Sequence, residues 1–225
     1  DYLFTKKIYN KLYSSNKYFD MNDILKLLQK KQDLMNINYH IIKKARVTHG
    51  FFTRLNGFSK NDFKSLNCSI SNGDNKKLVL KNRQKALKNL GLQNKKLILI
   101  NQIHSSKVVL INNSNINKKI KADGMMTSLN NIVLGVLTAD CAPIFIYDNK
   151  NRFVCCLHSG WKGTLKNISK KAVNMFRKHK INLKNITAIV GPCLNKKNYE
   201  VDRSFEKKFI KKKLKLFKIF YKKKY

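Results

Sequence analysis

The chain is poor in acidic residues, proline and long apolar runs. Its 225 residues hold 48 Lys and Arg but only 12 Asp and Glu, with two prolines and five cysteines. No apolar run approaches the ~20 residues that a membrane-spanning helix needs, so we expect no membrane partner. An odd number of cysteines, with Cys155 and Cys156 adjacent, argues against a disulfide framework. No segment resembles a secretory signal, and we therefore expect a cytoplasmic protein.

The net charge of +36 raises the question of nucleic-acid binding. The lysines are spread over the whole chain, and Asn and Ile are as frequent, which is typical of an AT-rich coding sequence. The aromatic platforms of single-strand binders and of RNA-recognition sheets are missing. We therefore expect no specific nucleic-acid partner, and we keep a basic nucleic-acid-binding module as an alternative function.

The sequence divides into two parts. Residues 1–40 form an amino-terminal extension that is partly helical, with a capped amphipathic helix from residue 20 to about residue 35. Residues 41–225 form the main domain. The chain begins at Asp1 rather than at Met, so we expect a fragment or a longer upstream extension. The tail over residues 203–225 alternates lysines with aromatic residues. We interpret it as a helix whose apolar face meets the core, with a membrane-surface helix as the alternative.

From residue 47 onward the pattern is typical of an α/β protein. Short apolar runs predict strands, and helical spacing of apolar residues predicts a helix ending at Gly91 and a second one capped by Thr164. The predicted strands cover residues 48–54, 97–100, 133–137, 153–158 and 186–190, and the helices cover residues 75–90 and 165–176.

Three of these apolar runs are each followed or ended by a residue that binds borderline metals. These residues are His104, Cys141 and His158. We interpret the runs as buried strands with a site residue at each carboxyl end, which is where α/β sheets carry their chemistry. Two imidazoles and one thiolate leave the fourth tetrahedral position of a zinc ion open, as catalytic zinc sites do. The pattern therefore favours a zinc enzyme.

The amino-acid sequence of these segments resembles that of the YfiH family, also called the laccase-domain or polyphenol-oxidase family. The resemblance extends over residues 47–201, and its most specific blocks are Asp-Cys-Ala-Pro at residues 140–143 and His-Ser-Gly-Trp-Lys-Gly at residues 158–163. Other matching blocks lie at residues 48–54, 101–104, 122–124, 191–193 and 199–201. The resemblance implies an α/β (α+β) layered sandwich of mixed β-sheets flanked by helices. It also implies that His104, Cys141 and His158 bind zinc.

The same resemblance implies an enzyme that acts on purine nucleosides. The expected reactions are phosphorolysis of adenosine, inosine, guanosine and methylthioadenosine, and deamination of adenosine. Purine nucleosides and phosphate would be its partners, and we expect a monomer or a homodimer. The chain departs from the family where Asn56 replaces a glycine after Arg54, and where it ends at Tyr225 without the family's further helix, strand and arginine-rich segment.

Charged groups near the expected centre suit these reactions. The guanidinium of Arg54 offers a planar fork for phosphate, and Lys162 adds charge in a glycine-flanked turn. We expect Gln102 to be a further substrate contact. A zinc deaminase also needs a carboxylate that carries a proton. The candidates for this role are Asp123, Asp140 and Glu200, with Asp140 also able to orient a metal ligand.

Five histidines without a His-x-His pair are too few for a multicopper cluster in one chain. Copper could still take the three-ligand site in place of zinc. A competing hypothesis keeps the same residues but makes Cys141 a thiolate nucleophile activated by His104 or His158. The protein would then be a cysteine- or zinc-dependent amidase that edits peptidoglycan precursors.

Overall fold

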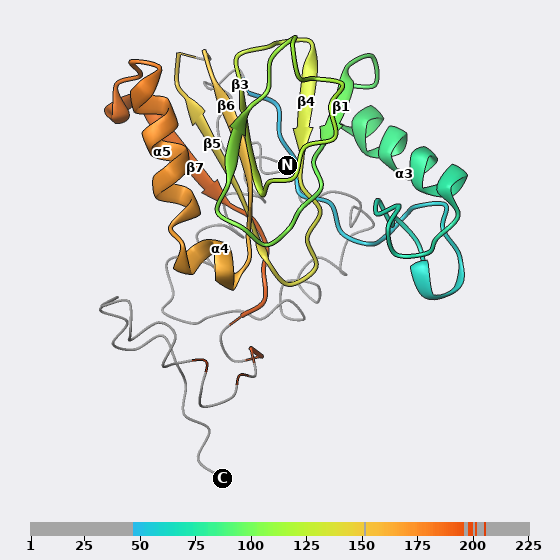
Figure 1. The fold of residues 1–225 in the computed structure, drawn as a ribbon. Coiled ribbons are helices and arrows are strands. Elements are labelled where there is room, and N and C mark those ends of the chain that lie inside the picture. The colour runs from blue at the N-terminus through green and yellow to red at the C-terminus, as the bar shows by residue number, and fades with distance from the viewer. Residues whose placement is uncertain (1–46, 151, 196–197, 200, 202–204, 206–225) are drawn as a thin grey trace, which may run out of the picture. The chain divides into compact units, whose positions relative to one another are not determined.

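The computed structural model describes residues 47–150, 152–195, 198, 199, 201 and 205 (Figure 1). The helix predicted over residues 20–35 and the tail beyond Phe205 lie outside these residues. None of the helices in the described part of the chain is both long and apolar enough to cross a membrane.

The described residues form two β-sheets. One sheet has five strands in the order β2-β3-β6-β5-β7, and the other pairs β1 with β4. β2 and β3 run parallel, as do β1 and β4, whereas the remaining pairs are antiparallel. The strands are β1 Lys96–Leu99, β2 Val108–Leu110, β3 Gly124–Thr127, β4 Ile132–Gly135, β5 Ala142–Asp148, β6 Val154–Ser159 and β7 Ile186–Val190. The mixed sheets confirm the fold class expected from the sequence.

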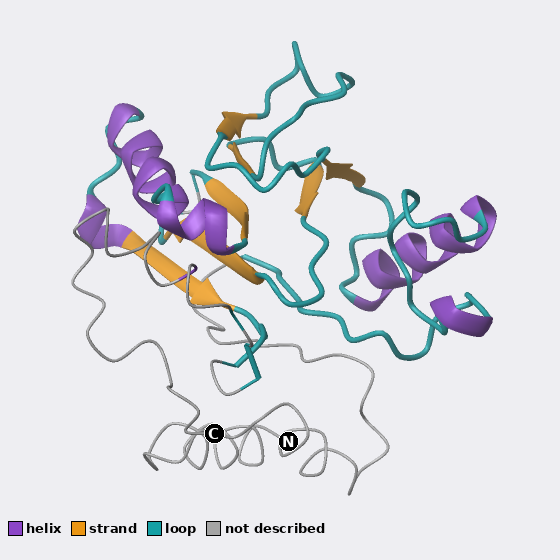
Figure 2. Ribbon diagram, turned by 60° about the horizontal axis from the view of Figure 1, so that its bottom comes forward, coloured by secondary structure: helices purple, strands orange, loops and turns teal. Residues whose placement is uncertain are grey.

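Helices lie on both sides of the sheets. α5 lies against the five-stranded sheet, and α3 lies on the side of β1 and β4 (Figure 1). The same separation is visible from a second direction (Figure 2). The helices are α3 Lys76–Asn89, α4 Trp161–Leu165 and α5 Ile168–Lys178, with short 3-10 turns η1 Asn61–Phe63 and η2 Leu183–Asn185.

α3 begins and ends where its capping residues predict. The side chain of Asn75 accepts hydrogen bonds from the amides of Lys77 and Leu78. At the other end Gly91 has φ +68°, and the amides of Gly91 and Leu92 donate to the carbonyls of Lys88 and Leu87. This is the Schellman arrangement, which favours glycine because it needs a left-handed residue. The predicted helix over residues 75–90 is confirmed.

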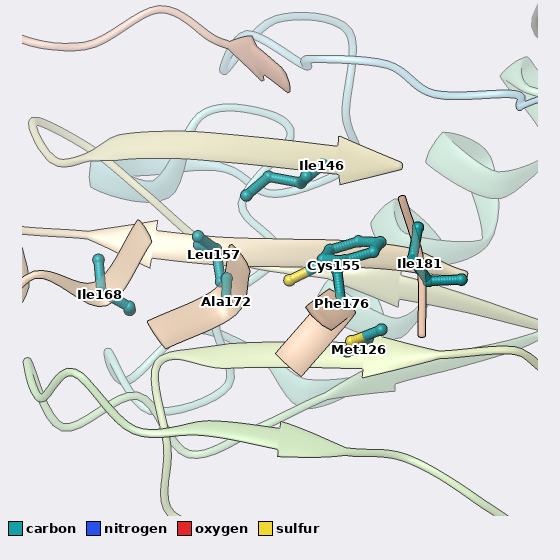
Figure 3. Packing of buried hydrophobic residues seen from close by; sticks show 8 residues of the cluster. All are labelled: Met126, Ile146, Cys155, Leu157, Ile168, Ala172, Phe176 and Ile181. Atoms are coloured by element: carbon teal, nitrogen blue, oxygen red, sulfur yellow. The ribbon is translucent and has the colours of Figure 1, made fainter. Parts of the chain in front are cut away.

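The main core lies between α5 and one face of the five-stranded sheet. Figure 3 shows Ala172 and Phe176 of α5 over β6, near Leu157 and Cys155. Both helix residues are fully buried, because they fall on one face at the helical period. Met126 on β3 and Ile146 on β5 complete this layer. The packing fixes β6, which carries His158, between its two neighbours.

A second core lies on the opposite face of the five-stranded sheet. Ile98 of β1 and Ile132 of β4 pack there against Met125 of β3. A largely apolar cavity of about 420 Å³ lies in the same layer, with α3, β1, β4 and the inner face of β5 and β6 in its walls. The three predicted metal ligands do not line it.

Some predicted elements differ from the observed ones. The single helix predicted after Thr164 is two helices, because Asn167 takes a left-handed conformation (φ 58°) between α4 and α5. α4 already begins at Trp161, so Thr164 lies inside it. Of the strand predicted over residues 48–54, Phe51 alone makes a β-bridge. Strands β2, β3 and β5 were not predicted. β5 has Pro143 as its second residue, which sequence patterns associate with edge strands.

Candidate metal centre

The structure brings His104, Cys141 and His158 together. One donor atom from each of the three side chains lies within 4.8 Å of the other two. The two imidazole rings are 4.8 Å apart between centroids and nearly perpendicular, at 81°. His158 is buried, Cys141 is partly exposed and His104 is exposed. The cluster is therefore open to a ligand from one side.

The register of the sheet explains why Cys141 meets His158. β5 and β6 are antiparallel, with Ala142 opposite Ser159 and Pro143 opposite His158. Cys141 directly precedes β5, so it lies beside the carboxyl end of β6. The prediction placed all three ligands at carboxyl ends of strands. His158 lies at the carboxyl end of β6, as predicted. Cys141 follows β4, the strand predicted before it, but it lies six residues beyond the end of β4 and directly before β5.

His104 lies on a loop, five residues beyond the end of β1. A parallel bridge between Asn101 and Lys121 holds this loop against the segment that leads to Asp123. His104 itself has φ 55°, a left-handed conformation that is uncommon for residues other than glycine. Strained residues of this kind persist where the surrounding contacts determine them, and they cluster at functional sites.

Asp123 supplies those surrounding contacts. Its carboxylate, which is fully buried, accepts hydrogen bonds from the backbone amides of His104 (2.9 Å) and Ser105 (2.6 Å), and from the Ser105 hydroxyl (2.7 Å). The amide of Ile103 adds a longer bond of 3.3 Å. One side chain thus determines the path of the loop that carries His104.

Asp123 also orients the second imidazole. Its Oδ1 lies 2.8 Å from Nδ1 of His158, and its backbone carbonyl accepts from the His158 amide at 2.7 Å. When Nδ1–H donates to the carboxylate, Nε2 keeps its lone pair for a metal ion. Burial opposes ionisation of Asp123, but the hydrogen bonds from His158, Ser105 and Ile103 outweigh it. The pKa of Asp123 therefore lies below its ordinary value.

Two glycines of the His-Ser-Gly-Trp-Lys-Gly block let α4 approach the centre. A Cβ on Gly160 would lie 3.0 Å from Sγ of Cys141 and 3.2 Å from Cδ2 of His104. A Cβ on Gly163 would lie 2.9 Å from the Ser105 carbonyl. From the sequence alone these two residues are expected only as glycines that flank a turn. Their role in close packing around the donors emerges from the structure.

The donor set fits a single borderline metal ion. Zinc takes imidazole nitrogen at ~2.0–2.1 Å and thiolate sulfur at ~2.3 Å, and catalytic zinc keeps three protein ligands and an open position. Asp123 behind His158 is the carboxylate partner that metal-bound histidines usually have. In the part of the chain that the structure describes, this is the one group of three or more His, Cys, Asp or Glu side chains close enough to share an ion.

The predicted substrate contacts have other partners in this structure. Nε and Nη2 of Arg54 donate to the Lys64 carbonyl at 2.9 and 2.6 Å. The amide of Gln102 forms two 2.8 Å hydrogen bonds with the backbone of Leu137 and so joins the segment after β1 to the one after β4. The Lys162 ammonium lies 5.5 Å from the centre of the neighbouring Trp161 ring. Their roles in substrate binding stay predictions.

Two of the three predicted carboxylates lie among the described residues, and their surroundings differ. Asp140 is exposed next to Cys141, whereas Asp123 is enclosed by donors. Glu200 lies outside the described residues. Tyr199 is a neighbour that the sequence analysis did not single out: burial raises the pKa of its hydroxyl, and the charges of Cys141 and Asp140 raise it further. Tyr199 is thus near enough to Cys141 and Asp140 to interact with their charges.

Comparison with known proteins places these features in a family. A family model described as "Multi-copper polyphenol oxidoreductase laccase" matches residues 48–224. A purine nucleoside phosphorylase of Rickettsia conorii is 32% identical over 116 residues, which is 52% of this chain and 47% of that protein. The purine nucleoside phosphorylase YlmD of Bacillus subtilis is 32% identical over 165 residues, or 69% of this chain and 59% of that protein.

Solved structures agree with these matches. The crystal structure of the Bacillus licheniformis hypothetical protein YfiH aligns with a TM-score of 0.69 and 29% identity, over 74% of this chain and 66% of that chain. YlmD from Geobacillus stearothermophilus aligns with a TM-score of 0.66 and 25% identity, over 71% and 62% of the two chains. This chain spans about half to two thirds of the length of the curated relatives described above. Since the family model matches well over half of it, the chain belongs to the laccase-like YfiH family.

Proposed function

We propose that this chain is a zinc-dependent purine nucleoside phosphorylase that also deaminates adenosine. The observation that carries the proposal is the group of His104, Cys141 and His158, two of which are positioned by Asp123. The names of the relatives, which are purine nucleoside phosphorylases, indicate the substrate class. Zinc suits the donor set better than a multicopper cluster, because the described residues bring only two imidazoles together.

His104, Cys141 and His158 would hold the ion. Bound by these residues, zinc would supply a Lewis acid. Asp123 serves as a positioning residue: it holds the His158 ring and the His104 backbone, and its lowered pKa makes it a poor proton acceptor. Asp140, exposed beside Cys141, has the freedom to carry a proton that Asp123 lacks.

Phosphorolysis requires cations that hold phosphate beside the ribose. Lys162 lies two residues after Gly160, the residue at which a Cβ would come 3.0 Å from Sγ of Cys141, and its long side chain suits a contact with an anionic ligand at the centre. The Arg54 guanidinium must first break its hydrogen bonds to the Lys64 carbonyl before it can donate hydrogen bonds to phosphate. We therefore assign the first phosphate contact to Lys162 and a second one to Arg54. The Tyr199 hydroxyl is a neutral donor available to the nucleoside.

The surroundings of Cys141 do not favour the reactive free thiolate that the amidase hypothesis requires. Burial raises the pKa of the Cys141 thiol, and the charge of Asp140 raises it further. A catalytic thiol needs the opposite shift, which cationic neighbours or a helix amino terminus provide. Cys141 is therefore better suited to binding a metal as a thiolate than to attacking an amide on its own.

The proposal is tested by metal content and by product analysis. The purified chain should contain one zinc per molecule and should convert adenosine and phosphate to adenine and ribose 1-phosphate, with inosine as the product of deamination. Cys141→Ser should lose most of the zinc and both activities, because a hydroxyl is a much poorer zinc ligand than a thiolate. Elemental analysis and chromatography of the products measure these quantities.

Cys68→Ser is the matched control, since Cys68 is a partly buried thiol outside the cluster. It should keep its zinc and its turnover. Full zinc occupancy in Cys141→Ser would remove Cys141 from the set of ligands. A zinc-loaded wild type that turns over none of the nucleosides would contradict the proposed activity, and salt-sensitive binding to nucleic acid in its place would favour the basic binding module.

A further inference from the structure

Cys193 lies opposite the candidate ligand Cys141 on a neighbouring segment. β5 and β7 are antiparallel, with Ile144 opposite Val190. Counting onward from this pair in the same register places Cys141 opposite Cys193, just beyond the ends of both strands. The two thiols come from segments about fifty residues apart in sequence, and the tertiary fold alone brings them together.

Backbone hydrogen bonds on both sides of this pair continue the contact between the two segments. The Gly191 amide donates to the Pro143 carbonyl at 2.9 Å, and the Leu194 amide donates to the Asp140 carbonyl, also at 2.9 Å. Directly opposed residues of antiparallel strands have Cβ atoms ~4.5–5.5 Å apart. A disulfide needs Cβ atoms ~3.5–4.5 Å apart, so a small shift at the strand ends brings the pair within bonding reach.

The two thiols also interact electrostatically. Cys193 is one of the groups close enough for its charge to act on the Cys141 thiol, after Asp140 and Asp123. Their exposure differs: Cys193 is exposed, whereas Cys141 is partly buried. A small oxidant therefore reaches Cys193 first and finds Cys141 behind it. Cys155 and Cys156 are nearly inaccessible, with exposed fractions of 3% and 2%.

We propose that Cys141 and Cys193 are an oxidisable pair, and that a peroxide joins them in a disulfide that removes Cys141 from the metal centre. The release of metal rests on the function proposed above, whereas the formation of the disulfide does not. The pair thereby makes the centre sensitive to oxidants at a residue, Cys193, that donates nothing to the metal in the described structure.

The chemistry balances with hydrogen peroxide as the oxidant. The Cys193 sulfur attacks one peroxide oxygen, the O–O bond breaks, and a sulfenic acid forms with loss of one water that takes up the thiol proton. The Cys141 sulfur then attacks the Cys193 sulfur, so the S–S bond forms as the S–O bond breaks. The oxygen leaves as a second water, which takes the Cys141 proton in the zinc-free chain and a proton from solvent where Cys141 is a zinc-bound thiolate. Two electrons pass from the two sulfurs to the two peroxide oxygens.

The experiment uses the full chain with and without zinc. Each sample is treated with a few equivalents of hydrogen peroxide, alkylated under denaturing conditions so that the buried thiols also react, and digested without reduction for mass spectrometry. We expect a peptide pair joined through Cys141 and Cys193, a fall in alkylatable thiols from five to three, and reversal by dithiothreitol. In the zinc-loaded sample a chromogenic chelator should detect one zinc released per disulfide formed.

Two variants separate this pair from other thiols. At the same peroxide dose, Cys193→Ser should release its zinc at least several-fold more slowly than the wild type. Its circular dichroism should match that of the wild type. Cys68→Ser should behave as the wild type does. Zinc release at the same rate in Cys193→Ser and the wild type would overturn the proposal, as would a Cys193–Cys193 link between two chains as the main product.

If the purified chain binds no zinc, the proposal is still tested by whether the disulfide between Cys141 and Cys193 forms in the zinc-free sample. Its absence in both samples overturns the oxidisable pair and leaves the phosphorylase hypothesis untouched. Conversely, a cross-link in a chain without nucleoside turnover supports the pair and contradicts the proposed function.

Discussion

Asp123 and Gly160 shape the candidate metal centre without contributing a donor atom. Asp123 accepts hydrogen bonds from the imidazole of one ligand and from the backbone of another, 2.8 and 2.9 Å away. Gly160 leaves the space that Cys141 and His104 occupy. Residues behind the ligands commonly determine metal affinity nearly as much as the ligands do. In this chain the effect can be tested by adding a single methyl group.

Gly160→Ala should weaken zinc binding by about tenfold or more, the range typical of changes to groups behind metal ligands. The new methyl group would lie 3.0 Å from Sγ of Cys141 and 3.2 Å from Cδ2 of His104, so one of these side chains must move. Gly160 has φ −74°, which alanine adopts without strain, and the fold should therefore be kept. Competition with a zinc chelator measures the affinity.

Gly91→Ala is the matched control for this substitution. A Cβ there has no neighbour within 4 Å, but the residue has φ +68°. The control should lower the free energy of unfolding by about 1–2 kcal/mol through backbone strain and leave zinc affinity unchanged. Wild-type zinc affinity in a folded Gly160→Ala protein would contradict the assigned role of Gly160.

At the scale of elements, α5 connects the core to the centre through β6. Ile168, Ala172 and Phe176 of α5 are fully buried against the strand that carries His158. The break at Asn167 turns α4 away from the axis of α5 and toward the loop of His104, where Gly163 meets the Ser105 carbonyl. The two short helices thus serve different parts of the molecule: α5 stabilises the sheet and α4 borders the metal donors.

Phe176→Ala should lower the free energy of unfolding by about 3–5 kcal/mol, because it leaves a cavity in a site that is fully buried. Lys178→Ala on the exposed side of the same helix should change it by less than about 0.5 kcal/mol. Urea titrations followed by circular dichroism measure both values. A change below about 1 kcal/mol for Phe176→Ala would show that α5 is not packed as described.

The whole molecule carries far more positive than negative charge. Its net charge is +36, and within the described residues Arg152 and Asp148 form an ion pair between two permanently charged groups. Such an excess of one sign destabilises the compact state through self-repulsion. Salt screens this repulsion, with a Debye length of ~10 Å at 0.1 M ionic strength.

The melting temperature should therefore rise as sodium chloride increases from low ionic strength to about 0.15 M, over which the Debye length falls to ~8 Å. Differential scanning calorimetry at fixed pH measures it, and potassium chloride serves as a control for a specific sodium effect. A melting temperature that stays level or falls over this range would mean that the lysines are too far apart, or too well solvated, for their repulsion to matter.

Much of the local structure was predictable from side-chain periodicity and capping residues. α3, with Asn75 before it and Gly91 after it, and the strand Ile186–Val190 follow from short stretches of sequence, because capping and burial of one face are local properties. β5 was not predictable in this way. Pro143 counts against a strand between two neighbours, yet its carbonyl accepts from Gly191 and its neighbours pair with β6.

The sequence by itself determined the fold class, the family and the three candidate donors, since each depends on residue types and their order along the chain. Only the tertiary structure decided that Cys141 meets His158 at the end of an antiparallel strand pair, that Asp123 binds the His158 imidazole and the His104 backbone, and that Gly160 leaves room for the candidate donors. The physical reason is that the hydrophobic periodicity of a segment indicates only which of its own side chains are buried. The register between segments arises only when several of them pack together.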